Sequence, residues 1–270
     1  MWLAVTLKVQ KASAKNSYCV YGHPSPFAFI GFAHALSVRA EVEQRGGVLA
    51  VFHDVEMCAT ENSFREFGFD LIRSAHRDSR NAFSVKGKTH LDTPKANLEV
   101  SICFEIQGSS YDGLKMRLSD AIATMRFAGG VIVSSSFKVV ETADEAFRMK
   151  AGFAMCAARI ERGDQTVFER MLNRISLEKG KKGWVKPSLV GFRLIEAPVI
   201  GRGGVRGGYS HAYADPIIGV VEFKSVRKAT VRDMWRIERS DRIIRFVTNE
   251  YIDMVGQEIS QGKENGKEQA

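Results

Sequence analysis

The segment with the most unusual composition in this 270-residue chain is Gly201-Arg-Gly-Gly-Val-Arg-Gly-Gly208. Glycines such as Gly203 and Gly204 let backbone N–H groups approach a phosphate closely, while Arg202 and Arg206 supply charge and forked donors. These properties suit a clamp on an RNA backbone. A dinucleotide site is disfavoured, because its glycine motif must open a helix, whereas a Tyr-Ser-His-Ala-Tyr run follows here. The alternative is a flexible surface hairpin.

A second candidate site for nucleic acid is the run Lys179-Gly-Lys-Lys-Gly-Trp184. It places the cations of Lys179, Lys181 and Lys182 beside the indole ring of Trp184. A stackable aromatic ring next to clustered cations is the pairing expected for single-stranded nucleic acid. Alternatively, Trp184 begins a strand and belongs to the core, with a solvated lysine turn before it.

Positive charge is concentrated in the part of the chain that contains both segments. The net charge is +8 and the isoelectric point is near 9.3. From Arg174 to Arg206 there are eight basic and two acidic side chains, a local excess of six positive charges. This distribution indicates an anionic partner, although charge alone does not identify it.

Motifs for catalysis or metal binding are missing from the sequence. The six histidines are scattered without helical metal-ligand spacing, the four cysteines form no CxxC pair, and neither GxSxG nor HExxH occurs. We therefore expect a protein that is not an enzyme, with no metal and no cofactor. RNA cleavage without a metal needs only a general base and a cation near a 2′-hydroxyl, which leaves no fixed spacing, so an endoribonuclease remains an alternative.

The hydrophobic pattern of the first half predicts strands and helices in the order β-α-β-β-α-β. The expected elements are a strand over 3–9, a helix from Ser25-Pro26 to Gly46-Gly47, strands over 48–57 and 98–106, a helix over 112–127 ended by Gly129-Gly130, and a strand from 131. This order is ferredoxin-like and is also the topology of RNA-recognition modules. The fold class is therefore α+β, a ferredoxin-like core with an elaborated second half.

The second half shows further strand and helix patterns. They predict strands near 152–160, 184–195 and 217–225, a helix near 164–177, and a long amphipathic helix over 230–255 in which Arg232, Arg236 and Arg239 share a face with interleaved acids. We expect a core over 1–140, a second half over 141–258 packed on it, and a disordered polar tail over 259–270.

Several blocks of sequence resemble one known family. The block Gly22-His-Pro-Ser-Pro-Phe-Ala-Phe-Ile-Gly-Phe-Ala-His-Ala-Leu36 is similar to the G-x-P-S-P-x-A-F-x-G-F-x-H-A-L signature of the Csy-two family, the Cas-five-type subunit of type I-F CRISPR surveillance complexes in the RAMP superfamily. Shorter blocks match in the expected order: Asn97-Leu-Glu-Val-Ser, Ala123-Thr-Met-Arg-Phe-Ala-Gly-Gly-Val-Ile132, Ala151-Gly-Phe-Ala, Gly183-Trp-Val-x-Pro and Gly191-Phe.

The resemblance implies a non-catalytic RNA-binding subunit for antiviral DNA targeting. Such a subunit grips the 5′ handle of the CRISPR RNA, caps a filament of Cas-seven-type backbone subunits, and usually contacts the large subunit that inspects target DNA. This sequence is shorter than the family between Phe153 and Trp184 and after Tyr213, which points to a reduced type I-F variant. Two alternatives stay open: a CRISPR RNA-processing endoribonuclease of the same superfamily, and a repeated backbone subunit of a minimal complex.

The candidate RNA-binding residues combine the basic segments with the family blocks. They are His23, Ser25, Arg126, Lys179, Lys181, Lys182, Trp184, Lys186, Arg202, Gly203, Gly204 and Arg206. Arg126 is expected at the end of a helix, where a cation complements the helix dipole and is also able to reach phosphate. With neither a basic leader nor an apolar run of membrane-spanning length, we expect no membrane contact and a cytoplasmic location.

Overall fold

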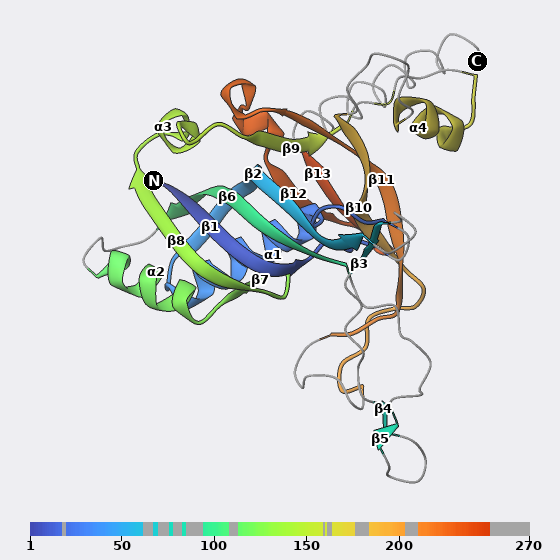
Figure 1. The fold of residues 1–270 in the computed structure, drawn as a ribbon, viewed down its shortest axis with the longest axis horizontal. Coiled ribbons are helices and arrows are strands. Elements are labelled where there is room, and N and C mark those ends of the chain that lie inside the picture. Colours follow the sequence, from blue (N-terminus) through green and yellow to red (C-terminus); the bar gives the residue numbers. More distant parts are fainter. Residues whose placement is uncertain are drawn as a thin grey trace, which may run out of the picture.

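Most strands belong to one large antiparallel sheet in the computed structural model (Figure 1). The structure describes residues 1–17, 20–61, 67–69, 76–77, 83–84, 94–107, 113–158, 160, 164–175, 184–202 and 210–248. The protein is therefore a mixed α+β protein in which strands predominate.

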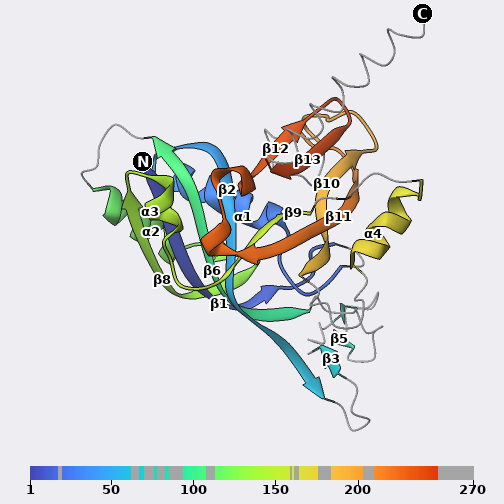
Figure 2. The same cartoon turned by 90° about the horizontal axis from the view of Figure 1, so that it is seen from above.

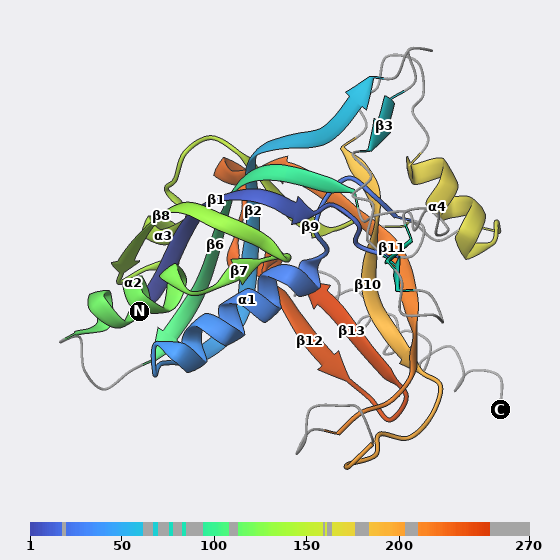
Figure 3. The same ribbon diagram turned by 60° about the horizontal axis from the view of Figure 1, so that its bottom comes forward.

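Four long strands of the first half form one end of this sheet. They are β1 (Trp2–Ser13), β2 (Glu43–Glu61), β6 (Lys95–Gln107) and β8 (Gly130–Val140). They lie in the order β2-β6-β1-β8, and each pairs antiparallel with its neighbour. The helices α1 (Pro26–Arg39) and α2 (Leu114–Ala123) follow β1 and β6 along the chain. Figure 3 shows α1 lying across these strands.

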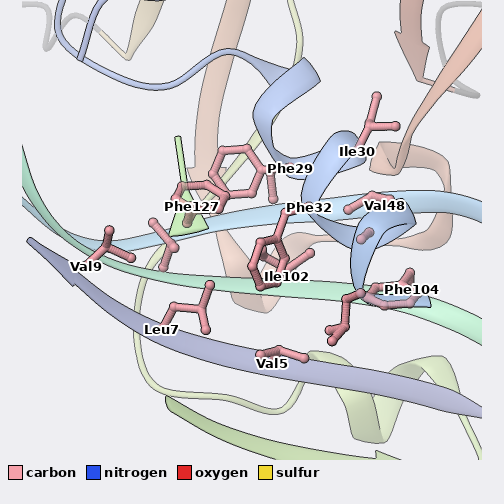
Figure 4. Packing of buried hydrophobic residues seen from close by; sticks show 14 of the residues in the cluster. Val5, Leu7, Val9, Phe29, Ile30, Phe32, Val48, Ile102, Phe104 and Phe127 are labelled. Atoms are coloured by element: carbon pink, nitrogen blue, oxygen red, sulfur yellow. The ribbon is translucent and has the colours of Figure 1, made fainter. Parts of the chain in front are cut away.

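The main core lies between this sheet and α1. In β1 the alternating residues Leu3, Val5, Leu7 and Val9 are buried, because successive side chains of a strand point to opposite faces. They meet the apolar face of α1 and the inward residues of β2 and β6 (Figure 4). The largest fully buried contributors include Phe29, Phe104, Phe127, Leu36 and Ile102. Helix α1 therefore buries one apolar face against the sheet.

The start of α1 matches the sequence prediction, whereas its end lies earlier. Ser25 is the extended N-cap residue and Pro26 is the first helical residue, although the Ser25 side chain makes no capping hydrogen bond. The helix ends at Arg39, before Gly46-Gly47. Those glycines lie inside β2, where Gly46 has φ +62° and the pairing with β6 shifts register between Arg45 and Val48. They shape a β-bulge and do not stop the helix.

The second helix is also shorter than predicted, and this moves Arg126 off the helix. Helix α2 ends at Ala123, and β7 (Arg126–Phe127) then pairs with the start of β8. Ala128 and Gly129 both have positive φ, +47° and +76°, as a two-residue hairpin turn of this kind requires. The Gly129-Gly130 pair therefore makes a hairpin, and the expected placement of Arg126 at a helix C-terminus is wrong.

We predict that Gly130→Ala destabilises the protein. A Cβ at residue 130 would lie 2.7 Å from the Cα and N atoms of Ala12 and from the carbonyl oxygen of Gln10, so β1 and β8 would have to move apart. The expected loss in the free energy of unfolding is about 1–3 kcal/mol, measured by urea denaturation. Gly31→Ala is the control, because its Cβ meets no atom within 4 Å in α1 and should stabilise by about 0.5–1 kcal/mol. Equal stability of the two variants would contradict the close strand packing.

The second half contributes the strands predicted for it and extends the same sheet. Strands β9 (Phe153–Ala157), β10 (Val185–Leu194) and β11 (Ala214–Ser225) and the helix α4 (Val167–Ile175) confirm the predicted patterns. Strand β9 pairs with β2 and β11, which joins the two halves. Figure 2 shows α4 near β11, at the opposite end of the molecule from α2. The short helix α3 (Ala143–Phe147) packs Ala146 and Phe147 into a second core cluster.

The prediction of a long helix over 230–255 is wrong. The described part of this region holds two 3-10 turns, η1 (Val226–Lys228) and η2 (Val231–Asp233), followed by strands β12 (Trp235–Arg239) and β13 (Ile243–Thr248). Arg232, Arg236 and Arg239 therefore do not share a helix face. A capping box between Thr230 and Asp233 holds η2. Trp235 pairs with Val48 of β2, so the strand path β12-β13-β10-β11-β9-β2 closes on itself.

Three short strands complete the described elements. Strand β3 (Phe67–Phe69) pairs with the end of β2, and β4 (His76–Arg77) pairs with β5 (Phe83–Ser84). No helix among the described residues is long and apolar enough to cross a membrane.

Candidate nucleic-acid interface

One pocket brings together three candidate residues that are far apart in the sequence: His23, Trp184 and Lys186. Its volume is about 350 Å³. The pocket is lined by Tyr21, Gly22, His23, Phe52, Val55, Phe153, Trp184, Lys186 and Phe223. We call it the aromatic pocket. A basic residue among aromatic rings is the combination used to bind unpaired bases.

The floor of the aromatic pocket is made by three rings. His23, which is 6% exposed, meets Phe52 and Phe223 edge-on, with ring centroids 6.2 and 5.3 Å away. The N–H at Nδ1 of His23 donates to the carbonyl of Pro24 at 3.0 Å. Its Nε2 is buried and makes no hydrogen bond of ordinary geometry. This nitrogen is shielded from solvent.

The protonation of His23 follows from its surroundings. Burial lowers the pKa of His23 below 6.5, and the charge of Lys186 lowers it further, while the carbonyls of Pro24 and Pro187 act in the opposite direction. The imidazole is therefore neutral at pH 7.

The mouth of the pocket is formed by exposed aromatic rings. Trp184 is 43% exposed and stacks on Phe153, with ring centroids 4.5 Å apart and a tilt of 30°. Tyr21 is 46% exposed and lies under the ammonium group of Lys15, 6.0 Å from the ring centroid. Trp184 is therefore an exposed ring and not a core residue.

Local chain geometry explains why these side chains converge. Gly22 has φ +122°, a conformation that residues with a Cβ rarely adopt, and it turns the chain so that His23 enters the core just before α1. The backbone of Trp184 is fixed by the hydrogen bond from the N–H of Phe223 at 2.8 Å. Since β10 begins at Val185, which is buried, the alternation of strand side chains leaves Lys186 exposed on the other face.

The buried imidazole predicts a stability profile in acid. The unfolded chain takes up a proton on His23 near pH 6.5, whereas the folded chain does so only at lower pH. The free energy of unfolding should therefore be unaffected by this group above pH 6.5 and fall below it, by at most about 1.4 kcal/mol per pH unit. Urea denaturation midpoints measured from pH 7 to pH 5 should fall less steeply for His23→Gln than for the parent. The control His34→Gln, at an exposed histidine, should behave like the parent. Parallel profiles would contradict this prediction.

The other candidate residues that the structure describes do not line the aromatic pocket. Ser25 is buried at the start of α1, and Arg126 is exposed on β7. Arg202 pairs with Glu196 and lies over the Tyr213 ring at 4.5 Å. The N–H of Tyr213 and Arg202 lower the pKa of Glu196. The guanidinium of Arg202 is therefore already engaged by a carboxylate. Lys179, Lys181, Lys182, Gly203, Gly204 and Arg206 lie outside the described residues.

Two groups with potential chemistry lie elsewhere, and their nucleophilic side chains are buried. His53 Nε2 is 2.7 Å from the Ser101 hydroxyl, the spacing of a base and a nucleophile, but Ser101 is fully buried and also bonds Thr6 at 2.7 Å. Burial raises the pKa of the Cys103 thiol to about 12 and also raises that of Cys156. In the part of the chain that the structure describes, no three metal-ligating side chains come together.

Fold and pocket define an α+β protein with an aromatic, basic cavity at the junction of its two halves. The model of the family described as CRISPR-associated protein (Cas_Csy2) matches residues 3–163, more than half of the chain. The chain therefore belongs to this family. It is similar to the CRISPR-associated protein Csy2 of Pseudomonas aeruginosa (strain UCBPP-PA14), with 31% identity over 137 residues. That match covers 47% of this chain and 40% of the relative.

Sequence reasoning missed most of the pocket's lining. Tyr21, Phe52, Phe153 and Phe223 were not among the candidates, although Phe153 lies in one of the blocks that resemble the family. No local signal marks Phe52 and Phe223, because an inward phenylalanine in a strand has the same pattern in a core and in a pocket.

Proposed function

We propose that the protein is a non-catalytic RNA-binding subunit of a type I-F-like CRISPR surveillance complex, and that it holds the 5′ handle of the CRISPR RNA. The observation that carries the proposal is the convergence of His23, Trp184 and Lys186 in the aromatic pocket of a protein of this family. Exposed rings bind single strands by stacking, and nearby cations bind the phosphates.

The arrangement of the first half supports a RAMP-type, ferredoxin-like core. Its strands and helices follow in the order β-α-β-β-α-β once the short strands are set aside, and the sheet order β2-β6-β1-β8 interleaves the two β-α-β units. This is the split arrangement expected for RNA-recognition folds. Fold alone does not establish RNA binding, so the pocket remains the main support.

The proposed partners are the CRISPR RNA and Cas-seven-type backbone subunits, which the protein would cap at one end of the filament. Contact with a large subunit and with target DNA belongs to the same proposal. The described helix between β9 and β10 is α4, Val167–Ile175.

One observation favours a second candidate, the RNA-processing endoribonuclease. The neutral imidazole of His23 is a possible general base, and the cation of Lys186 lines the same pocket. Against cleavage, the imidazole forms the buried floor of the pocket and is 6% exposed, so a 2′-hydroxyl would have to enter the pocket completely to reach it.

The test of the proposal is co-purification with the products of neighbouring genes, followed by sequencing of the bound RNA. We expect guide RNAs with a shared 5′ end, bound at defined stoichiometry. Recovery of the assembled complex with this subunit contacting only protein would overturn the proposal.

The chain should leave precursor RNA intact, because the imidazole of His23, the candidate base in the aromatic pocket, is buried. The measurement is gel analysis of precursor RNA incubated with the purified protein, with and without magnesium. Specific cleavage that is lost in His23→Gln would replace the proposed function by the endoribonuclease.

A further inference from the structure

The geometry of the aromatic pocket indicates the kind of ligand that it takes: we infer that it holds one unstacked nucleobase of the RNA. This inference rests on the proposed function, since it requires that the chain binds RNA. It goes further by assigning a single base, and not the phosphate backbone, to this cavity.

The size of the pocket suits a single nucleoside. Its volume of about 350 Å³ is near the lower end of the range for small-ligand pockets, about 300–1,000 Å³. An element of partner protein or two stacked bases would need a larger opening. The exposed rings lie at the mouth, and the buried His23 and Phe52 lie at the floor beside the half-buried Phe223, so a flat ligand would meet aromatic surface along the pocket.

The stacking surface is the free face of Trp184. A base inserted between two rings needs a centroid separation of about 7–8 Å, twice the contact distance of carbon atoms. Phe153 and Trp184 are 4.5 Å apart, so nothing fits between them. Phe153 therefore covers one face of the indole. The base stacks on the opposite face of Trp184, whose side chain is 43% exposed.

The rings and the cation together favour a nucleotide over an apolar side chain of a partner protein. Stacking on an aromatic ring suits every base, because every base has a flat π-face. The cation of Lys186 lines the same pocket and is available to the phosphate attached to the base.

The experiment uses the purified full chain and a short synthetic RNA with the 5′-end sequence of the RNA that co-purifies with the protein. A series of RNAs carries one abasic site at each successive position. Since stacking contributes about 1–3 kcal/mol per base, one position should show a loss in affinity of about 5- to 150-fold, and its neighbours much less.

Variants connect that position to the pocket. Trp184→Ala should weaken binding of the intact RNA by a similar factor and remove the penalty of the critical abasic site, while Trp184→Phe should retain most of both. Phe168→Ala is the matched control, because Phe168 is 67% exposed on α4, outside the lining of the pocket. Circular dichroism verifies that the variants are folded.

The outcomes separate the two proposals. If the parent chain binds no RNA, the proposed function fails and the pocket inference fails with it. If the parent binds RNA but no position is sensitive, or the sensitive position persists unchanged in Trp184→Ala, only the pocket inference is overturned. A Trp184→Ala chain that binds RNA normally but no longer assembles with its partner subunits would show that the pocket holds a protein side chain instead.

Discussion

RNA affinity of this protein is expected to fall by about 10²–10³-fold between 50 and 200 mM salt. Each phosphate contact to a single strand contributes roughly 0.7 to the slope of log affinity against log salt, and six contacts would give this loss. The excess of six positive charges between Arg174 and Arg206 is the basis for that number of contacts. Fluorescence anisotropy with a labelled RNA over a salt series measures the slope.

Replacing Lys179, Lys181 and Lys182 together by alanine should lower this slope by about 2, since three contacts are lost. A matched control removes the same charge elsewhere: Lys115, Arg148 and Arg227 are exposed on α2, beside α3 and in η1, away from the aromatic pocket. The control should change affinity only slightly. If the two triple variants give the same slope, the RNA does not follow the basic segment.

The largest effect on stability is expected for Trp235→Ala, which should lower the free energy of unfolding by about 3–5 kcal/mol. Trp235 is fully buried, and its indole N–H donates to the carbonyl of Met155 at 2.6 Å. Truncation leaves a cavity and an unsatisfied carbonyl at the place where β12 meets β2 and β9. Both halves of the chain therefore lose support at once.

Urea denaturation of the whole chain measures this loss, with Met116→Ala as the control. Met116 is 67% exposed on α2, and its truncation should change stability by less than about 0.5 kcal/mol. Trp235→Phe should fall between the two, because it keeps most of the volume and loses the hydrogen bond. A loss of under 1 kcal/mol for Trp235→Ala would show that β12 is not packed against β2.

The first half of the fold could be predicted because its strands show an alternation of apolar residues with a period of two and its helices show the helical period. Alternation in β1 and β6, and the Ser25-Pro26 start of α1, are local signals that the structure confirms. The ends of both helices could not be predicted from glycine pairs. Gly46-Gly47 lies in a β-bulge and Gly129-Gly130 in a hairpin. In the sequence, a glycine with positive φ has the same appearance in a bulge, in a hairpin and at the end of a helix.

The region after Thr230 shows a second limit. Trp235, Ile237 and Ile243 to Val247 fit both a helical stripe and two short strands, and short apolar runs do not discriminate between them. Pairing with β2 and β10, which are distant in the sequence, decides in favour of strands. Contacts between residues so far apart in the sequence produce no signal in the local sequence pattern.

The sequence predicted individual residues of the candidate site but not their arrangement. His23, Trp184 and Lys186 were chosen for separate reasons, and nothing in their spacing places them in one cavity. The pairings of β9 with β2 and β11, and of β10 with β11, bring Phe153, Phe223 and Trp184 beside His23. The site thus depends on the register of several non-local strand pairs.

The most direct measurement of the central claim is ultraviolet crosslinking of the protein to its co-purified RNA, followed by mass spectrometry of the adducts. If the aromatic pocket contacts the guide RNA, the nucleotide adducts should fall on the peptides that contain Tyr21 to His23 and Trp184 to Lys186, and should decrease in Trp184→Ala. Adducts confined to the surface around Arg126 on β7, with none on the pocket peptides, would contradict the account.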